Sequence, residues 1–176
     1  MVRAEGRRGG GAVTSGSRGE EALRVLHQVK DPEVPVLSVV ELGIIRGIDA
    51  EGRRVAVTIT PTYSGCPAMK VIEDDVREAL ERAGFGDIGI KTVYSPAWTT
   101  DWIPEPAREK LRAYGIAPPA HVVEELVPLG RTVRAVSCPF CGSPNTVLES
   151  EFGATACKAL FVCRTCRQPF EHFKAF

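Results

Sequence analysis

The sequence predicts an α+β protein, a small helix-strand-strand-helix-strand sandwich followed by a metal-binding module. Three observations lead to this prediction. Several segments carry apolar residues at helical spacing, shorter segments alternate apolar with polar residues, and two Cys-x-x-Cys pairs stand near the C-terminus. A chain of 176 residues has room for one ordinary domain and a small appendage.

The first half of the main domain is expected to hold one helix and two strands. Apolar residues recur at helical spacing over residues 20–30, and the proline-rich run 31–35 ends this helix because neither proline can donate a backbone hydrogen bond. The apolar run 36–48 and the alternating run 53–60 predict two strands. Residues 1–19 are rich in Gly and Arg and poor in large apolar groups, so we expect a disordered leader there.

A second helix, a third strand and a third helix complete the main domain, which we assign to residues 20–119. Apolar residues trace one helical face over residues 69–83, and an alternating strand follows over residues 88–94. A third apolar face predicts a helix over residues 101–114. Residues 120–136 are expected to link this domain to the last module.

Residues 137–176 are expected to form a zinc ribbon. The two Cys-x-x-Cys pairs stand at a spacing close to that of four-cysteine zinc sites, and such knuckles bring four thiolates into a tetrahedron. A rubredoxin-like iron or an iron–sulfur cluster also takes four cysteines, and these alternatives stay open at this point. The predicted ligands are Cys138, Cys141, Cys163 and Cys166.

The composition disfavours several classes of function. Basic and acidic residues both number 22, so no global field attracts nucleic acid or an anionic membrane. No apolar run approaches the roughly 20 residues of a membrane-spanning helix, and we expect a cytoplasmic protein with neither kind of partner. In that reducing compartment cysteines serve as metal ligands or reactive thiols. Because the four-cysteine set is complete, Cys157 is interpreted as a half-buried thiol and His172 as a surface imidazole.

The remaining cysteine, Cys66, stands directly before Pro67 at the expected start of the second helix. Orphan backbone N–H groups and the helix dipole favour a thiolate at that position, so Cys66 is a candidate nucleophile or soft-metal ligand. An inert capping or buried cysteine is the competing interpretation. A thiol enzyme is disfavoured because the sequence offers no assignable general base.

Several runs resemble known families. The runs DPEVPVLSVVELG (31–43) and TPTYSGCP (60–67) resemble the SufT-like iron–sulfur assembly domain family, and the coarse element order agrees with that fold. Joined to PAWTTDWI (96–103), YGIAPP (114–119) and SEFGATACK (150–158), they resemble the accessory proteins of aerobic phenylacetate degradation, which fuse this domain to a zinc ribbon. The resemblance runs from about residue 20 to the end of the sequence.

This resemblance implies an accessory protein, not an enzyme, that matures the multicomponent monooxygenase that epoxidises phenylacetyl-CoA. It implies that Cys66 takes part in iron–sulfur assembly, carrying iron or a cluster transiently, and that Glu41 accompanies it as an acid. The implied clients are the iron–sulfur reductase or the diiron subunit of the oxygenase. A stoichiometric, non-catalytic subunit of the oxygenase is the alternative. A nucleic-acid-binding ribbon is disfavoured because the charges of the last module nearly balance.

Overall fold

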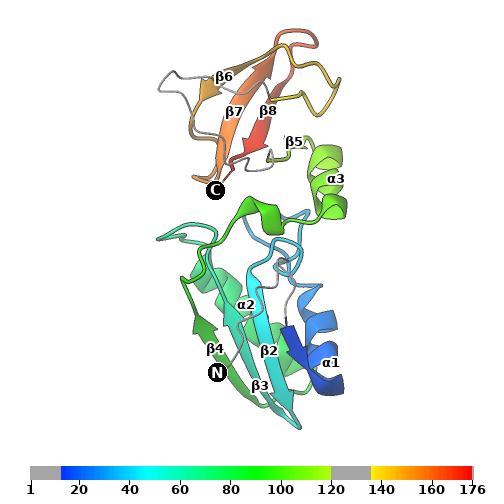
Figure 1. The fold of residues 1–176 in the computed structure, drawn as a ribbon, viewed down its shortest axis with the longest axis vertical. Coiled ribbons are helices and arrows are strands. Elements are labelled where there is room, and N and C mark those ends of the chain that lie inside the picture. The colour runs from blue at the N-terminus through cyan, green and yellow to red at the C-terminus, as the bar shows by residue number, and fades with distance from the viewer. Residues whose placement is uncertain (1–12, 120–135, 176) are drawn as a thin grey trace, which may run out of the picture.

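A computed structural model describes residues 13–119 and 136–175 of the chain. It contains an α+β unit and a β ribbon stacked end to end, with the C-terminal end of the described chain near their junction (Figure 1). The predicted fold class is therefore confirmed. Within the described residues, none of the helices has the length and apolar character needed to span a bilayer.

The α+β unit is a four-stranded mixed sheet, covered by two helices that also contact each other. Strand β2 runs parallel to β1 and antiparallel to β3, and β4 runs parallel to β3. The parallel pair requires a crossover, which α2 supplies between β3 and β4. The elements are β1 (Val13–Ser15), α1 (Gly16–Leu26), β2 (Ile45–Glu51), β3 (Arg54–Ile59), α2 (Met69–Arg82) and β4 (Asp87–Thr92).

The predicted leader is too long, because residues 13–19 form β1 and the start of α1. Arg18 explains part of this order. Its guanidinium lies 4.2 Å from the ring centroid of Phe85 and donates a hydrogen bond of 2.9 Å to the Gly52 carbonyl. Composition alone does not reveal these contacts, because an arginine in a Gly-rich run is normally expected to be exposed to solvent. Residues 1–12 of the predicted leader lie outside the described residues.

The first predicted strand is wrong over residues 36–44, which form tight turns instead. The Glu41 carboxylate accepts hydrogen bonds from the Ser38 backbone N–H (2.9 Å) and hydroxyl (3.0 Å), and such local bonds compete with strand pairing. Gly43 has a φ of +76°, and a Cβ at this position would lie 3.2 Å from the Trp102 Cβ. Most apolar side chains of this segment are nevertheless buried. The segment is therefore rich in apolar residues, as a buried strand would be.

The ribbon is a second four-stranded sheet, in the order β5-β8-β7-β6. Its edge strand β5 comes directly after α3, so residues assigned to the main domain by the sequence belong to the ribbon sheet. Helix α3 begins at Glu105 because Pro104 is extended, and residues 100–102 form a short 3-10 turn (η1) before it. The elements are α3 (Glu105–Tyr114), β5 (Ile116–Ala117), β6 (Thr146–Ser150), β7 (Lys158–Cys163) and β8 (Pro169–Phe173).

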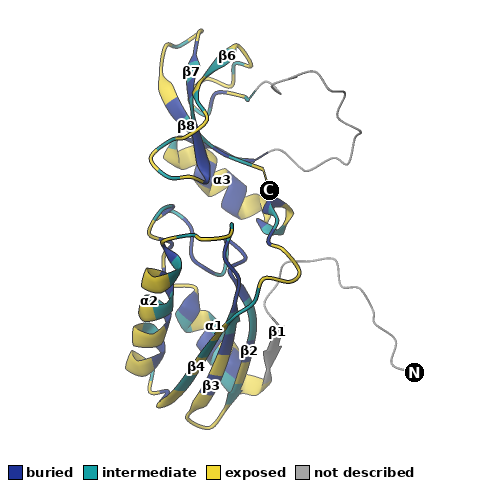
Figure 2. Ribbon diagram, turned by 90° about the vertical axis from the view of Figure 1, so that its left-hand side faces the viewer, coloured by how far each residue is buried: buried dark blue, intermediate teal, exposed yellow. Residues whose placement is uncertain are grey.

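The base of the ribbon packs into the core of the α+β unit. Phe173 at the end of β8 is 1% exposed, and its ring centroid lies 6.1 Å from that of Trp98. Trp98 in turn donates its indole N–H to the Leu42 carbonyl at 2.9 Å. Buried residues continue from the sheet of the lower unit into β8 (Figure 2). One apolar core therefore spans the junction of the two units.

Candidate metal centre and thiol cavity

The four predicted ligands converge at the end of the ribbon remote from the main domain. Their sulfur atoms all lie within 4.8 Å of one another. The Cys138 and Cys166 sulfurs are 3.7 Å apart, and the Cys141 and Cys163 sulfurs are 3.6 Å apart. A tetrahedral zinc with Zn–S bonds of about 2.3 Å places its sulfurs roughly 3.8 Å apart. The donor set therefore fits a closed four-thiolate site.

Each cysteine pair lies in a tight turn that depends on a left-handed residue four positions after the first cysteine. Gly142 has a φ of +72° and donates its N–H to the Cys138 carbonyl at 2.9 Å. Arg167, with a φ of +63°, makes the same bond to the Cys163 carbonyl at 2.8 Å. The Cys166 N–H points at the Cys163 sulfur at 3.5 Å and helps lower the pKa of that thiol to about 6. Backbone N–H groups thus stabilise one thiolate of the set, whereas burial and the neighbouring cysteines raise the pKa of Cys166 to about 12.

Cys66 lines a small cavity at the junction of the two units. The cavity volume is about 10 Å³, which is the space one water molecule occupies. Asp31, Glu33 and Met69 of the α+β unit line it together with Cys66, and Cys157 and Phe173 of the ribbon complete its wall. Two thiols from distant parts of the chain therefore share one cavity, which we call the Cys66 cavity.

The environment of Cys66 disfavours the thiolate, which corrects the sequence prediction. Helix α2 begins at Met69, so Cys66 precedes the helix instead of capping it. Burial is the main cause that raises the pKa of the Cys66 thiol, and the negative charges of Glu33 and Asp31 raise it further. The Ala68 N–H and a hydrogen bond with Tyr63 act in the opposite direction without reversing the shift. Cys66 is thus a protonated thiol in this arrangement.

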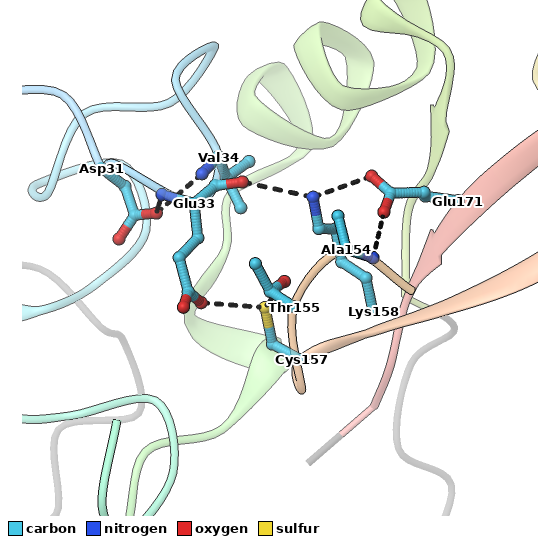
Figure 3. Close-up of polar contacts among 8 residues, drawn as sticks. All are labelled: Asp31, Glu33, Val34, Ala154, Thr155, Cys157, Lys158 and Glu171. Carbon is cyan, nitrogen blue, oxygen red and sulfur yellow. Dashed lines mark hydrogen bonds and ion pairs between the residues drawn. The ribbon is translucent and has the colours of Figure 1, made fainter. Parts of the chain in front are cut away.

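Cys157 was expected to be a half-buried thiol, but it is fully buried, and sequence reasoning missed its place in this cavity. Its side chain is 2% exposed, and its sulfur donates a hydrogen bond of 3.4 Å to Glu33 Oε2 (Figure 3). Thr155 Oγ1 lies 3.1 Å from the same sulfur. Burial, together with the charge of Glu33, raises the pKa of Cys157 to about 12. The sequence shows Cys157 between the two Cys-x-x-Cys pairs, but its spacing from them matches no metal-ligand pattern. Its partners are therefore known only from the fold.

The loop that carries Glu33 is held from both sides (Figure 3). Within the loop, Asp31 Oδ1 accepts the backbone N–H groups of Glu33 and Val34, both at 2.8 Å. From the ribbon, the buried Lys158 ammonium donates to the Glu33 carbonyl at 3.3 Å and pairs with Glu171 at 2.7 Å. The ribbon therefore fixes the acidic loop beside Cys66.

Glu41, the predicted accompanying acid, is absent from the lining of the Cys66 cavity. Its carboxylate pairs with Lys110 of α3 and accepts two hydrogen bonds from Ser38. Burial opposes ionisation, but these partners outweigh it and lower the pKa of Glu41 to about 2. The carboxylates beside Cys66 are those of Asp31 and Glu33, and an assembly role for Glu41 stays a prediction.

His172 is half-buried between the ribbon strands, in contrast to the surface position expected from sequence. Its Nδ1 lies 3.2 Å from the Ala117 carbonyl, and its ring meets Phe161 edge-on at 5.6 Å between centroids. Burial lowers the pKa of His172. The imidazole therefore stabilises the β5–β8 pairing and belongs to neither sulfur site.

The comparisons with known proteins match the two parts of the chain separately. Residues 20–91 match the model of a family described as iron-sulfur cluster assembly protein, and residues 124–174 match that of the PaaD zinc beta ribbon domain. An Escherichia coli (strain K12) protein, named as one subunit of a "Putative 1,2-phenylacetyl-CoA epoxidase", is 46% identical over 155 residues, which cover 88% of this chain and 91% of that protein. The chain belongs to the PaaD family.

Other relatives of this PaaD-family chain are shorter. A Porphyromonas gingivalis protein named "Fe-S protein maturation auxiliary factor" is 39% identical, over 52% of this chain and 89% of its own length. A Bacillus anthracis crystal structure of a domain of unknown function, DUF59, is 26% identical with a TM-score of 0.49, over 52% of this chain and 89% of that chain. Within the PaaD-family chain, Cys66 and Glu33 fall in the assembly-protein match, whereas Cys157 and the four knuckle cysteines fall in the ribbon match.

Proposed function

We propose that this protein is an accessory factor that matures a multicomponent phenylacetyl-CoA epoxidase. It assists assembly of an iron–sulfur or diiron centre in another subunit and does not itself turn over the substrate. The match to the iron–sulfur assembly family and the likeness to a protein named as part of an epoxidase support this role. The name of the shorter relative, a maturation auxiliary factor, supports it as well.

The Cys66 cavity is the observation that carries the proposal. A half-buried thiol whose pKa is raised is a poor nucleophile, and no histidine is found among the described residues that line the cavity. Covalent catalysis is therefore disfavoured. A soft metal ion, in contrast, binds by displacing thiol protons, and the competing protons keep its affinity moderate at neutral pH. Such a site suits cargo that is held and then passed on.

We infer that the ion in the ribbon is zinc and that its role is structural. Four thiolates in a closed tetrahedron leave no position for water or substrate, as is usual for structural zinc. The family model that covers this segment is described as a zinc ribbon. Cys138, Cys141, Cys163 and Cys166 would hold the ion and so tie the two knuckle turns together.

The client we propose is either the iron–sulfur reductase or the diiron subunit of the oxygenase. The experiment compares oxygenase subunits purified from cells that lack this protein, contain it, or contain Cys66→Ser. Iron and sulfide are measured in each subunit, and epoxidase activity at matched protein levels. We expect Cys66→Ser to match the deletion, and the component that loses metal identifies the client. Ser64→Ala, an exposed change in the same loop, is the control. Full metal content with Cys66→Ser would refute the assembly role.

A stoichiometric, non-catalytic subunit is the second candidate. Exposed aromatic side chains favour it, because Phe140 of the first knuckle (56% exposed) and Tyr114 at the end of α3 (58% exposed) are large apolar groups at the surface. The Phe140 ring lies over Gly115, the residue that follows Tyr114. Purification of the mature oxygenase decides between the candidates, since a subunit stays bound at a fixed ratio and an assembly factor does not.

A further inference from the structure

We propose that Cys66 and Cys157 together hold one divalent, thiophilic metal ion at the junction, with the Glu33 carboxylate as third ligand. The inference rests on the proposed function and deepens it, because it names the ligands and the form of the cargo. Iron(II) is the cargo that fits an assembly role. The second thiol comes from the ribbon, so neither matched segment contains the whole site.

The donor atoms around the cavity have the chemistry of such a site. Cys66 and Cys157 contribute two sulfurs to the lining, and Glu33 contributes a carboxylate that already contacts the Cys157 sulfur at 3.4 Å. Thiolates select soft and borderline cations, and a mixed sulfur–oxygen set suits iron(II), cobalt(II) or zinc. Magnesium and calcium prefer oxygen ligands alone. The site therefore discriminates against the abundant hard cations.

The size of the cavity limits the cargo to a single ion. Its volume of about 10 Å³ accommodates one water-sized guest. A four-iron cluster, with several metal and sulfide atoms, is much larger than that space. The junction as it stands thus receives mononuclear iron, and a preassembled cluster would require the ribbon to move away from the α+β unit.

Ion binding requires the donor atoms of the three side chains to move closer together. Among the described residues, the knuckle quartet is the only group of three or more such ligands whose donor atoms all lie within 4.8 Å. Cys157 must turn its sulfur from Glu33 toward the ion. Both thiols lose their protons to solvent, so one divalent cation replaces two protons and no electron is transferred. Lys158 keeps the loop of Glu33 in place during this exchange.

Cobalt(II) provides the test, because its bonds to thiolate sulfur give a characteristic charge-transfer absorption. The full-length protein, with zinc already in the ribbon, is titrated with cobalt(II). We expect one cobalt per chain in addition to the zinc. Cys66→Ser and Cys157→Ser should each weaken binding by about tenfold or more, and the double variant should abolish it. Glu33→Gln should weaken it too, whereas Glu78→Gln, an exposed carboxylate on α2, should not.

A second measurement uses the wild-type protein alone and so does not depend on how the variants fold. The X-ray absorption spectrum of the added cobalt should show two sulfur neighbours. Cobalt found only in the ribbon, a single sulfur neighbour for the added cobalt, or wild-type affinity in folded Cys157→Ser would each overturn the composite site. The shared site can fail while the proposed function stands: this is the result if Cys66→Ser abolishes maturation and Cys157→Ser supports it fully. Full maturation with Cys66→Ser would instead refute the proposed function.

Discussion

The two ends of strand β7 place sulfur in opposite electrostatic environments. At the knuckle end, the Cys166 N–H points at Cys163, and the pKa of Cys163 falls to about 6. Just before the other end, burial beside the Glu33 carboxylate raises the pKa of Cys157 to about 12. Cys157 and Cys163 thus stand at opposite ends of the same strand, and the pKa of one is raised whereas the pKa of the other is lowered.

This difference indicates what each site is suited to do. The ribbon supplies four cysteine ligands in one closed set, which favours permanent binding of a metal ion. Carboxylates and burial around a sulfur make protons compete with the metal, which favours release. The ribbon site is therefore suited to fix structure, and the Cys66 cavity is suited to hold cargo for a limited time. Stability and metal content of single variants test this contrast.

Removal of a knuckle ligand should have the largest effect. Cys138→Ser is expected to lose the ribbon metal and unfold the ribbon, because structural zinc contributes roughly 10 kcal/mol or more to the folding of small zinc modules. Elemental analysis measures the metal, and NMR spectra measure the order of the ribbon. Ser137→Ala, an exposed change beside the ligand, is the control. A folded, metal-loaded Cys138→Ser protein would show that the site is not structural.

Truncation of Phe173 should have the next largest effect, because this side chain joins the two units. Phe173→Ala is expected to destabilise the zinc-loaded protein by about 3–5 kcal/mol, the usual cost of removing a buried phenylalanine. Phe152→Ala changes a side chain that is 67% exposed and should cost less than about 1 kcal/mol. Urea unfolding followed by fluorescence measures both. Equal effects would show that the ribbon and the α+β unit do not share a core.

Elements with a regular local pattern could be predicted from the sequence. Helix α2 was predictable because Ile72, Val76 and Leu80 recur on one helical face, and all three are buried. The knuckle quartet was predictable because two local Cys-x-x-Cys turns determine most of its geometry. In both cases the information lies within a few residues or in a repeated spacing.

The composite cavity could not be predicted, because it depends on contacts between distant segments. Cys157 meets Glu33 only because Phe173 and its neighbours dock the ribbon onto the α+β unit. The raised pKa of Cys66 depends on the same packing, and a helix-start argument gave the opposite direction. Local rules describe the position of a thiol in a helix, whereas burial and charge are properties of the folded chain.

Glu41, the acid predicted from the sequence, should contribute to stability, and this contribution should depend on pH. Glu41→Gln is expected to destabilise the protein at pH 7 by about 1–3 kcal/mol, because the ion pair with Lys110 and the bonds from Ser38 lower the pKa of Glu41 to about 2 in the folded state. A carboxyl with a lowered folded pKa stabilises above its unfolded pKa of roughly 4.3 and loses that effect as the pH falls toward 2.

Urea unfolding of the wild type and Glu41→Gln at several pH values checks this expectation. The difference in unfolding free energy should be full at pH 7, shrink below about pH 4 and approach zero near pH 2. Glu78→Gln, whose side chain is 64% exposed, serves as the control and should show little difference at any pH. A constant difference across this range would mean that Glu41 acts through packing and not through its charge.

Removal of the cavity thiol should have the smallest effect on stability. Cys66→Ala is expected to cost about 1 kcal/mol, because the thiol is only half-buried, lies beside an existing cavity and loses one backbone hydrogen bond from Ala68. The urea midpoint of the zinc-loaded protein measures this cost, with the slope of unfolding as a check on cooperativity. A loss above about 3 kcal/mol would place Cys66 with the structural cysteines, as a packing residue of the junction. A loss near 1 kcal/mol, compared with the unfolding of the ribbon in Cys138→Ser, would show that the knuckle site contributes much more to folding than Cys66 does.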